Sequence, residues 1–187
     1  MRVIAGKFRS RRLAGPGSLR IRPTSDRLRE TLFNVLGPSV ADSLFVDLFA
    51  GTGAVGIEAI SRGAREVVFV ESNAKAVGLI RRNLESLQIG SGVELIEAKT
   101  ERGMEKIAVH RRVADFVFLD PPYEAADEYT NALDYLDSSH ILAPYGIVIV
   151  EHSRKMSLPL RFTRLERSRL LEQGDASLSF YRLAAAA

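Results

Sequence analysis

Two carboxylates flank a glycine-rich stretch in the first third of the chain. Gly51, Gly53 and Gly56 have the spacing G-x-G-x-x-G, which many nucleotide-binding loops share and which is a weak signal by itself. Asp47 lies just before this stretch, where an anion would repel a pyrophosphate but attract an ammonium group, directly or through water. Glu71 follows a second apolar run, and a carboxylate there can accept hydrogen bonds from both hydroxyls of a ribose. The pattern therefore favours S-adenosylmethionine over NAD.

A second chemical motif is Asp120-Pro121-Pro122-Tyr123. Two successive prolines with fixed φ form a stiff platform, which suits methylation of the exocyclic amine of a nucleobase. That amine is a poor nucleophile because its lone pair is delocalised into the ring. If the Asp120 carboxylate and a proline carbonyl accept its two N–H groups, the lone pair can tilt toward a sulfonium methyl group, while Tyr123 stacks on the base. The alternative is a rigid turn that ends a buried strand.

Short apolar runs that alternate with helical patterns must position these motifs. Ser25 or Asp26 can cap a first helix, which Gly37-Pro38 ends, and Asn73 can cap another. Strands are predicted at 44–48, 66–70, 93–96, 115–119 and 146–150. Helices are predicted from the glycine-rich stretch to about 63, from 73 to 87, after 100 and at 128–136, and a closing antiparallel pair at 161–165 and 176–183. Continuous apolar strands followed by helices indicate a parallel sheet covered on both faces.

The first thirty residues are strongly basic. They carry a net charge of +7, from nine basic and two acidic side chains, so the rest of the chain sums to −4. A cationic arm on a mildly acidic body is typical of a protein that binds a polyanion, although a solvated tail has the same charge. Apolar residues within the arm favour folding onto the body, as a hairpin turned at Gly15-Pro16-Gly17.

Length and composition restrict the class further. The chain has 187 residues and no cysteine, which excludes disulfides, cysteine zinc sites and thiol nucleophiles. The three histidines have no metal-ligand spacing, so no metal is expected. We find no transmembrane run and no signal-peptide pattern, and expect no membrane partner. The sequence predicts a cytoplasmic, monomeric protein with one domain at 1–187, in which 1–24 form the arm, 25–183 the catalytic core and 184–187 a frayed tail.

The whole chain resembles the bacterial family of small-subunit (16S) ribosomal RNA guanine-N2 methyltransferases. The matching segments are VIAGKFRSRRL, RPTSDRLRETLFNVL, DLFAGTGAVGIEAISRGA, the strand ending VES, FLDPPY and the closing SFYRL. The resemblance implies a class I, Rossmann-like α/β methyltransferase fold: a seven-stranded, mostly parallel sheet with helices on both faces and an antiparallel last strand. It also implies that the substrate is 16S ribosomal RNA in assembled or assembling small (30S) subunits.

The resemblance further implies three groups of functional residues. The target amine would bind at Asp120, Pro121, Pro122 and Tyr123. S-adenosylmethionine would bind at Asp47, Phe49, Ala50, Gly51, Thr52, Gly53, Glu71, Ser72 and Ala98. The RNA would bind at Lys7, Arg9, Arg11, Arg12, Arg22, Thr24 and Arg27. Many methyltransferases have an acid after the third strand that contacts adenine, but this chain has Ala98-Lys99, so recognition of adenine by the backbone is expected.

Three other functions compete with this interpretation. Amino-methylation of DNA adenine or cytosine, or of a protein glutamine, uses the same chemistry. However, DNA enzymes usually carry a recognition domain for which this chain has no room, and a protein substrate does not require a basic arm. An NAD-dependent oxidoreductase is disfavoured by Asp47 and by the Asp120–Tyr123 turn. A non-catalytic RNA-binding assembly factor would retain the fold without needing Asp120.

Overall fold

The computed structural model describes residues 1–17, 24–122 and 125–184. The chain divides into two compact units, Met1–Lys99 and Thr100–Ala187. Across the described residues, no helix has the length and apolar character needed to cross a membrane.

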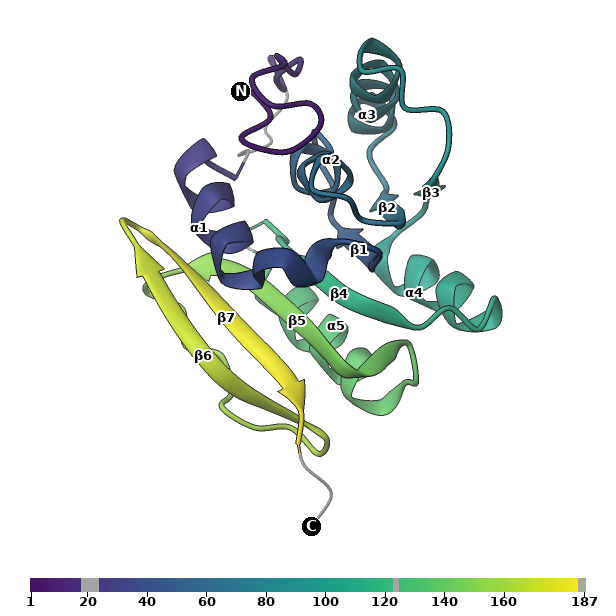
Figure 1. Ribbon diagram of the computed structural model, residues 1–187. Coiled ribbons are helices and arrows are strands. Elements are labelled where there is room, and N and C mark those ends of the chain that lie inside the picture. Colours follow the sequence, from purple (N-terminus) through teal and green to yellow (C-terminus); the bar gives the residue numbers. More distant parts are fainter. Residues whose placement is uncertain (18–23, 123–124, 185–187) are drawn as a thin grey trace. The chain divides into compact units, whose positions relative to one another are not determined.

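The first unit contains three parallel strands in the order β3-β2-β1. Val46 of β1 pairs with Val68 of β2, and Val68 pairs with Glu94 of β3. Because β1 is buried along its whole length, it carries a continuous apolar sequence that only Asp47 interrupts. The elements of this unit (Figure 1) are α1 (Asp26–Leu36), the 3₁₀ helix η1 (Gly37–Val40), β1 (Leu44–Leu48), α2 (Ala54–Ser61), β2 (Glu66–Glu71), α3 (Ala74–Ser86) and β3 (Val93–Glu97).

The second unit contains four strands in the order β4-β5-β7-β6. β4 and β5 are parallel, and β7 is antiparallel to both β5 and β6. Tyr129 and Leu133 of α5 are fully buried. The elements of this unit are α4 (Thr100–Val109), β4 (Ala114–Leu119), α5 (Ala126–Ser138), β5 (Leu142–Ser153), β6 (Leu165–Gln173) and β7 (Ala176–Leu183).

The predicted fold class is confirmed, since the chain forms a seven-stranded mixed sheet with helices and an antiparallel last strand. Two strand boundaries were wrong. The penultimate strand lies at 165–173 and shares only Leu165 with the predicted 161–165, where Arg161 makes an isolated bridge to Glu166. β6 is mostly exposed and rich in charge, so it lacks the apolar run that marks a buried strand. β5 begins at Leu142, earlier than the predicted 146.

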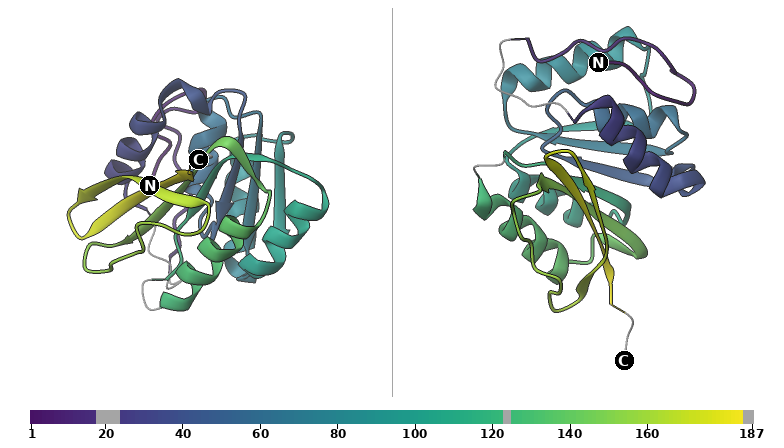
Figure 2. Two further views of the ribbon diagram at one scale, coloured as in Figure 1. Left: turned by 90° about the horizontal axis from the view of Figure 1, so that it is seen from below. Right: turned by 90° about the vertical axis from the view of Figure 1, so that its left-hand side faces the viewer.

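The N-terminal arm folds back on itself and lies against α2 and α3 (Figures 1 and 2). Arg2 and Arg12 form an antiparallel bridge, and Val3 N–H donates to Arg11 O at 3.0 Å. The chain therefore reverses within residues 4–10. The predicted turn at 15–17 would pair with residues 18–23, which lie outside the described residues. In the predicted frayed tail, Ala184 N–H donates to Arg164 O, while 185–187 also lie outside the described residues.

Candidate functional site

Asp47 is buried beneath the glycine-rich loop that connects β1 to α2. Its side chain is 2% exposed, and its Oδ2 accepts a hydrogen bond from Gly56 N–H at 2.9 Å. The pKa of Asp47 is raised to about 8, mainly by burial and also by the nearby charge of Glu71, while the hydrogen bond from Gly56 acts in the opposite direction. Asp47 thus fixes the start of α2 to β1 and holds a proton near neutral pH, which an approaching cation would help to displace.

The loop itself has an unusual backbone conformation. Phe49, Gly51 and Gly53 all have positive φ, at 61°, 55° and 75°. For Phe49 this conformation is strained, and such strain concentrates at functional sites. Gly53 N–H donates to Ala50 O at 2.7 Å, and Ala50 N–H donates to Val70 O of β2 at 3.0 Å. The predicted cofactor residues of the loop therefore form a tight turn that is attached to the adjacent strand.

Glu71 ends β2 and holds two backbone segments in place. Its Oε2 accepts from Gly51 N–H at 2.8 Å, and its Oε1 accepts from Asn73 N–H at 2.7 Å. Asn73 in turn caps α3, because its side-chain oxygen accepts from Lys75 and Ala76 N–H. A carboxylate has about four acceptor positions, so Glu71 retains capacity for ribose hydroxyls while it orders the loop.

The other predicted cofactor residues occupy different environments. Thr52 is buried, whereas Ser72 is exposed. Ala98 N–H donates to Glu71 O at 3.1 Å. A backbone contact to adenine at Ala98 would therefore have to use the carbonyl or compete with this hydrogen bond.

The Asp-Pro-Pro turn directly follows β4 in the second unit. Asp120 is partly exposed, Pro121 is buried and Pro122 is exposed. The hydroxyl of Tyr129, fully buried in α5, donates to Pro121 O at 3.0 Å. Ala125 N–H donates to Pro122 O at 2.8 Å. Both proline carbonyls are thereby fixed in direction, and each keeps a lone pair, while predicted Tyr123 lies outside the described residues.

Sequence reasoning did not identify Tyr129. A tyrosine on the buried face of a helix needs a partner for its hydroxyl. The sequence signal for this hydrogen bond was a tyrosine on the helix that follows the turn, eight residues after Pro121.

The predicted RNA-binding residues mostly lie on the surface of the first unit. Arg11 also donates to Ser86 O at the end of α3, at 3.0 Å. Thr24 is 6% exposed, and Arg22 lies outside the described residues. The exposed predicted residues are Lys7, Arg9, Arg11, Arg12 and Arg27.

Arg29 differs from the other basic residues near the N-terminus because it is fully buried. Its Nη2 donates to Arg2 O and to Asp26 Oδ1 at 2.9 Å. Desolvation lowers the pKa of Arg29 from its usual value, although the negative charges of Asp26 and Glu58 act to raise it. Arg29 therefore attaches the arm to α1 and is not a surface cation.

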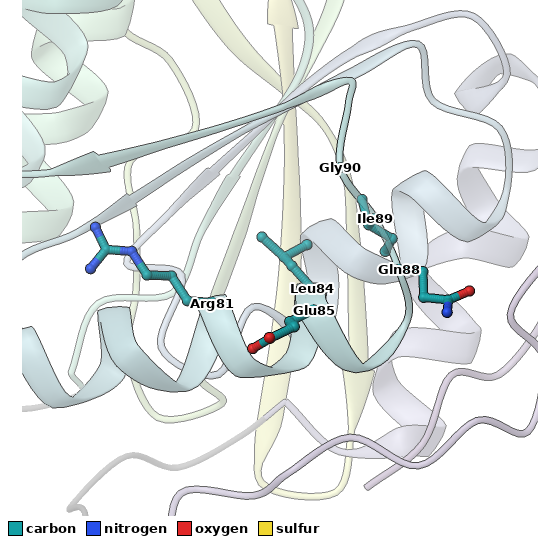
Figure 3. A pocket seen from close by; sticks show the side chains of 6 residues that line it. All are labelled: Arg81, Leu84, Glu85, Gln88, Ile89 and Gly90. Atoms are coloured by element: carbon teal, nitrogen blue, oxygen red, sulfur yellow. The ribbon is translucent and has the colours of Figure 1, made fainter.

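A hollow of about 460 Å³ lies at the C-terminal end of α3 (Figure 3). It does not coincide with the glycine-rich loop, and one of its lining residues, Arg81, forms an ion pair with Glu97. The hollow is lined by Arg81, Leu84, Glu85, Gln88, Ile89 and Gly90.

Among the described residues, no group of three or more His, Cys, Asp or Glu side chains could hold a metal ion.

The strand order and the loop after the first strand define a class I methyltransferase fold, and comparisons with known proteins agree. The solved structure of the Escherichia coli protein yhhF, provisionally described as a methyltransferase, superimposes with a TM-score of 0.81 and 28% identity, covering 100% of this chain and 99% of that one. A structure of SMU.776 complexed with SAH, with a TM-score of 0.69 and 15% identity, covers 87% of this chain and 50% of that one and supports the fold alone.

The family follows from sequence similarity. The model of the family described as conserved hypothetical protein 95 matches residues 1–182. The Haemophilus influenzae protein named ribosomal RNA small subunit methyltransferase D is 33% identical over 185 residues, covering 98% of this chain and 92% of its own length. The chain belongs to the family described as conserved hypothetical protein 95. Its similarity to the Haemophilus influenzae protein confirms the expected resemblance to small-subunit ribosomal RNA methyltransferases.

Proposed function

We propose that this protein transfers the methyl group of S-adenosylmethionine to ribosomal RNA of the small subunit, and that the acceptor is the exocyclic N2 amine of a guanine. Support for RNA methylation comes from the full-length similarity to ribosomal RNA small subunit methyltransferase D. The observation that carries the proposal is the pair of carboxylates Asp47 and Glu71. Glu71 holds the glycine-rich loop at Gly51 N–H, and Asp47 holds the start of α2 at Gly56 N–H. Both carboxylates lie near the carboxyl ends of two adjacent parallel strands, where open α/β sheets bind ligands.

The residues of the loop fit the proposed cofactor. Glu71 has acceptor capacity for both ribose hydroxyls, and Asp47 provides negative charge for the ammonium group. The positive-φ turn at Gly51 and Gly53 brings backbone close to the ligand. When bound, S-adenosylmethionine supplies an electrophilic methyl group on a sulfonium, so the chain needs no metal for this chemistry.

The Asp-Pro-Pro turn fits an amine acceptor. In this proposal the Asp120 carboxylate and the Pro121 carbonyl accept the two N–H groups of the guanine amine, which directs the nitrogen lone pair toward the methyl group. Tyr123 stacks on the base. Catalysis is then mainly positioning, and the protein spends binding energy to take the guanine out of its stack.

The basic arm fits a ribosomal substrate. Its exposed cations contact RNA phosphates, and the substrate is the assembled or assembling 30S particle. In this proposal the whole chain acts as one catalytic domain. The protein works as a monomer and is located in the cytoplasm.

Mass spectrometry of nucleosides tests the proposal directly. Small-subunit particles incubated with the protein and labelled S-adenosylmethionine should yield N2-methylguanosine, whereas N6-methyladenosine or unmodified RNA would refute the guanine assignment. The variant Asp120→Ala should lose methylation and retain RNA, which excludes a non-catalytic assembly factor. Asp134→Ala, a change at an exposed carboxylate of α5, is the matched control and should retain activity. Calorimetric titration should show binding of S-adenosylmethionine and not of NAD.

A further inference from the structure

The first eight residues run along α2 and are fixed to it by buried polar groups. The carboxylate of Glu58 accepts from Ile4 N–H at 2.8 Å and from Ala5 N–H at 3.0 Å. Ser61 Oγ accepts from Phe8 N–H at 2.9 Å. A side chain at Gly6, where φ is +80°, would lie 2.8 Å from Ser61 Oγ and overlap its carbonyl. This segment is therefore built into the first unit and is not a free tail.

Both ends of the arm hairpin are connected to the glycine-rich loop at Thr52, one directly and the other through Asn83. The Thr52 hydroxyl donates to Met1 Sδ at 3.6 Å. Asn83 of α3 provides the other attachment: its Nδ2 donates to Thr52 O at 3.0 Å and to Ala14 O at 3.3 Å, and its Oδ1 accepts from Ala14 N–H at 2.8 Å. The side chain of Asn83 is buried, at 1% exposure, so water cannot readily replace these hydrogen bonds.

Thr52 lies between the two glycines that shape the loop. Gly51 N–H is held by Glu71, and Gly53 is the N-cap of α2. A shift of Ala14 would therefore act through Asn83 on the backbone that separates the two glycines. The cations Lys7, Arg9, Arg11 and Arg12 belong to the same hairpin that Ala14 follows.

We propose that Asn83 is a positioning residue that couples the RNA-binding arm to the cofactor loop, so that RNA and cofactor each raise the affinity for the other. The inference rests on the function proposed above, because it takes the loop as the S-adenosylmethionine site and the arm as an RNA site. Coupling between two binding sites is reciprocal. RNA that shifts the hairpin would move Ala14 and, through Asn83, Thr52, and cofactor that shifts the loop would act on Ala14 by the same hydrogen bonds.

The test measures the dissociation constant of labelled S-adenosylhomocysteine, which binds without turnover, for the full-length protein with and without saturating 30S particles at fixed salt. The ratio of the two constants is the coupling factor. We expect roughly fivefold or more for the unaltered protein, within the usual range of coupling energies, and a value near one for Asn83→Ala. Asn131→Ala, at an exposed asparagine of α5, should keep the full coupling factor.

The coupling factor separates positioning from a merely structural role. If Asn83 only supports the fold, Asn83→Ala weakens both affinities and leaves the ratio unchanged, which overturns the inference. A ratio of one in the unaltered protein overturns it as well. Asn83→Asp is the second variant in case the alanine protein does not fold. It keeps an acceptor for Ala14 N–H but cannot donate to Thr52 O, so it should also lower the ratio.

The methylation assay on unaltered protein distinguishes this failure from failure of the proposed function. A protein that forms N2-methylguanosine but shows no coupling refutes only the role of Asn83. A protein that forms no methylated guanosine refutes the function itself.

Discussion

Gly56 offers a direct test of how the glycine-rich loop is packed on the sheet. It lies in the first turn of α2, and its φ is not positive, so an alanine there would not be strained by backbone conformation. A Cβ atom at this position would overlap Phe69 Cε1 and lie 2.8 Å from Phe69 Cζ and 2.9 Å from Val67 Cγ1. Both neighbours are fully buried side chains of β2, so neither can swing into solvent.

The expected magnitude follows from this crowding. Overpacking a well-packed core costs about 1–3 kcal/mol, while replacing a helical glycine with alanine contributes about 1 kcal/mol of stability. Because the clash involves an aromatic ring in the interior of a strand, we expect Gly56→Ala to lower the free energy of unfolding by about 2 kcal/mol. At this chain length, the melting temperature should fall by about 4–8 °C.

Gly78 provides the matched control because it lies inside α3 and has no atom within 4 Å of an added Cβ. Gly78→Ala should raise the free energy of unfolding by up to about 1 kcal/mol. Equilibrium unfolding in urea measures both variants. If Gly56→Ala proves as stable as Gly78→Ala, α2 does not pack on β2 as described, and the argument from close packing is refuted.

Three further outcomes are expected. Tyr129→Phe removes the hydroxyl that fixes Pro121 O and should destabilise the protein by about 1 kcal/mol. It should also lower kcat for methylation and leave the Kd for S-adenosylmethionine unchanged. An unchanged kcat would contradict a role of Tyr129 in positioning the turn. The pKa of Asp47 is raised to about 8, and a bound ammonium group favours the carboxylate, so the affinity for S-adenosylmethionine should rise from pH 6 to 8, by at most about tenfold per pH unit. Calorimetry of Asp47→Asn should show no such rise. An equal rise in both proteins would exclude this role of Asp47. When Lys7, Arg9 and Arg12 are replaced by alanine together, the slope of log K for RNA against log salt should become shallower by roughly 2–3. Filter binding across a salt series measures this slope, and equal slopes for the variant and the unaltered protein would argue against phosphate contacts.

Local signals predicted the helix boundaries well. Asn73 caps α3 as expected, and the apolar positions Val77, Ile80, Leu84 and Leu87 are all buried. Ser25 rather than Asp26 caps α1, with Leu28 N–H donating to Ser25 Oγ. The sequence left these two candidates open because both residue types are good caps. The structure assigns Asp26 to an ion pair with Arg29 instead.

Signals that depend on tertiary contacts were less accessible. Charge counting treats Arg29 and Arg9 alike, yet one is fully buried and the other exposed. Whether a basic side chain is buried depends on partners far along the chain, which net charge does not record. Net charge is equally silent on Thr24, which the resemblance places among the RNA-binding residues and whose side chain is buried in the structure.

The carboxylates of the glycine-rich loop show how far residue types determine a site. Their positions after two strands could be predicted, but the backbone partners of Asp47 and Glu71 could not, because these depend on how the loop turns. In the structure, Glu71 accepts from Gly51 N–H in the loop, and Asp47 accepts from Gly56 N–H in the first turn of α2. Replacing either carboxylate therefore changes loop geometry as well as ligand contacts. A loss of cofactor binding in Glu71→Ala alone would not separate the two effects. Glu71→Gln removes the charge and keeps an acceptor for one of the two backbone N–H groups, so it changes the geometry of the loop less than alanine does.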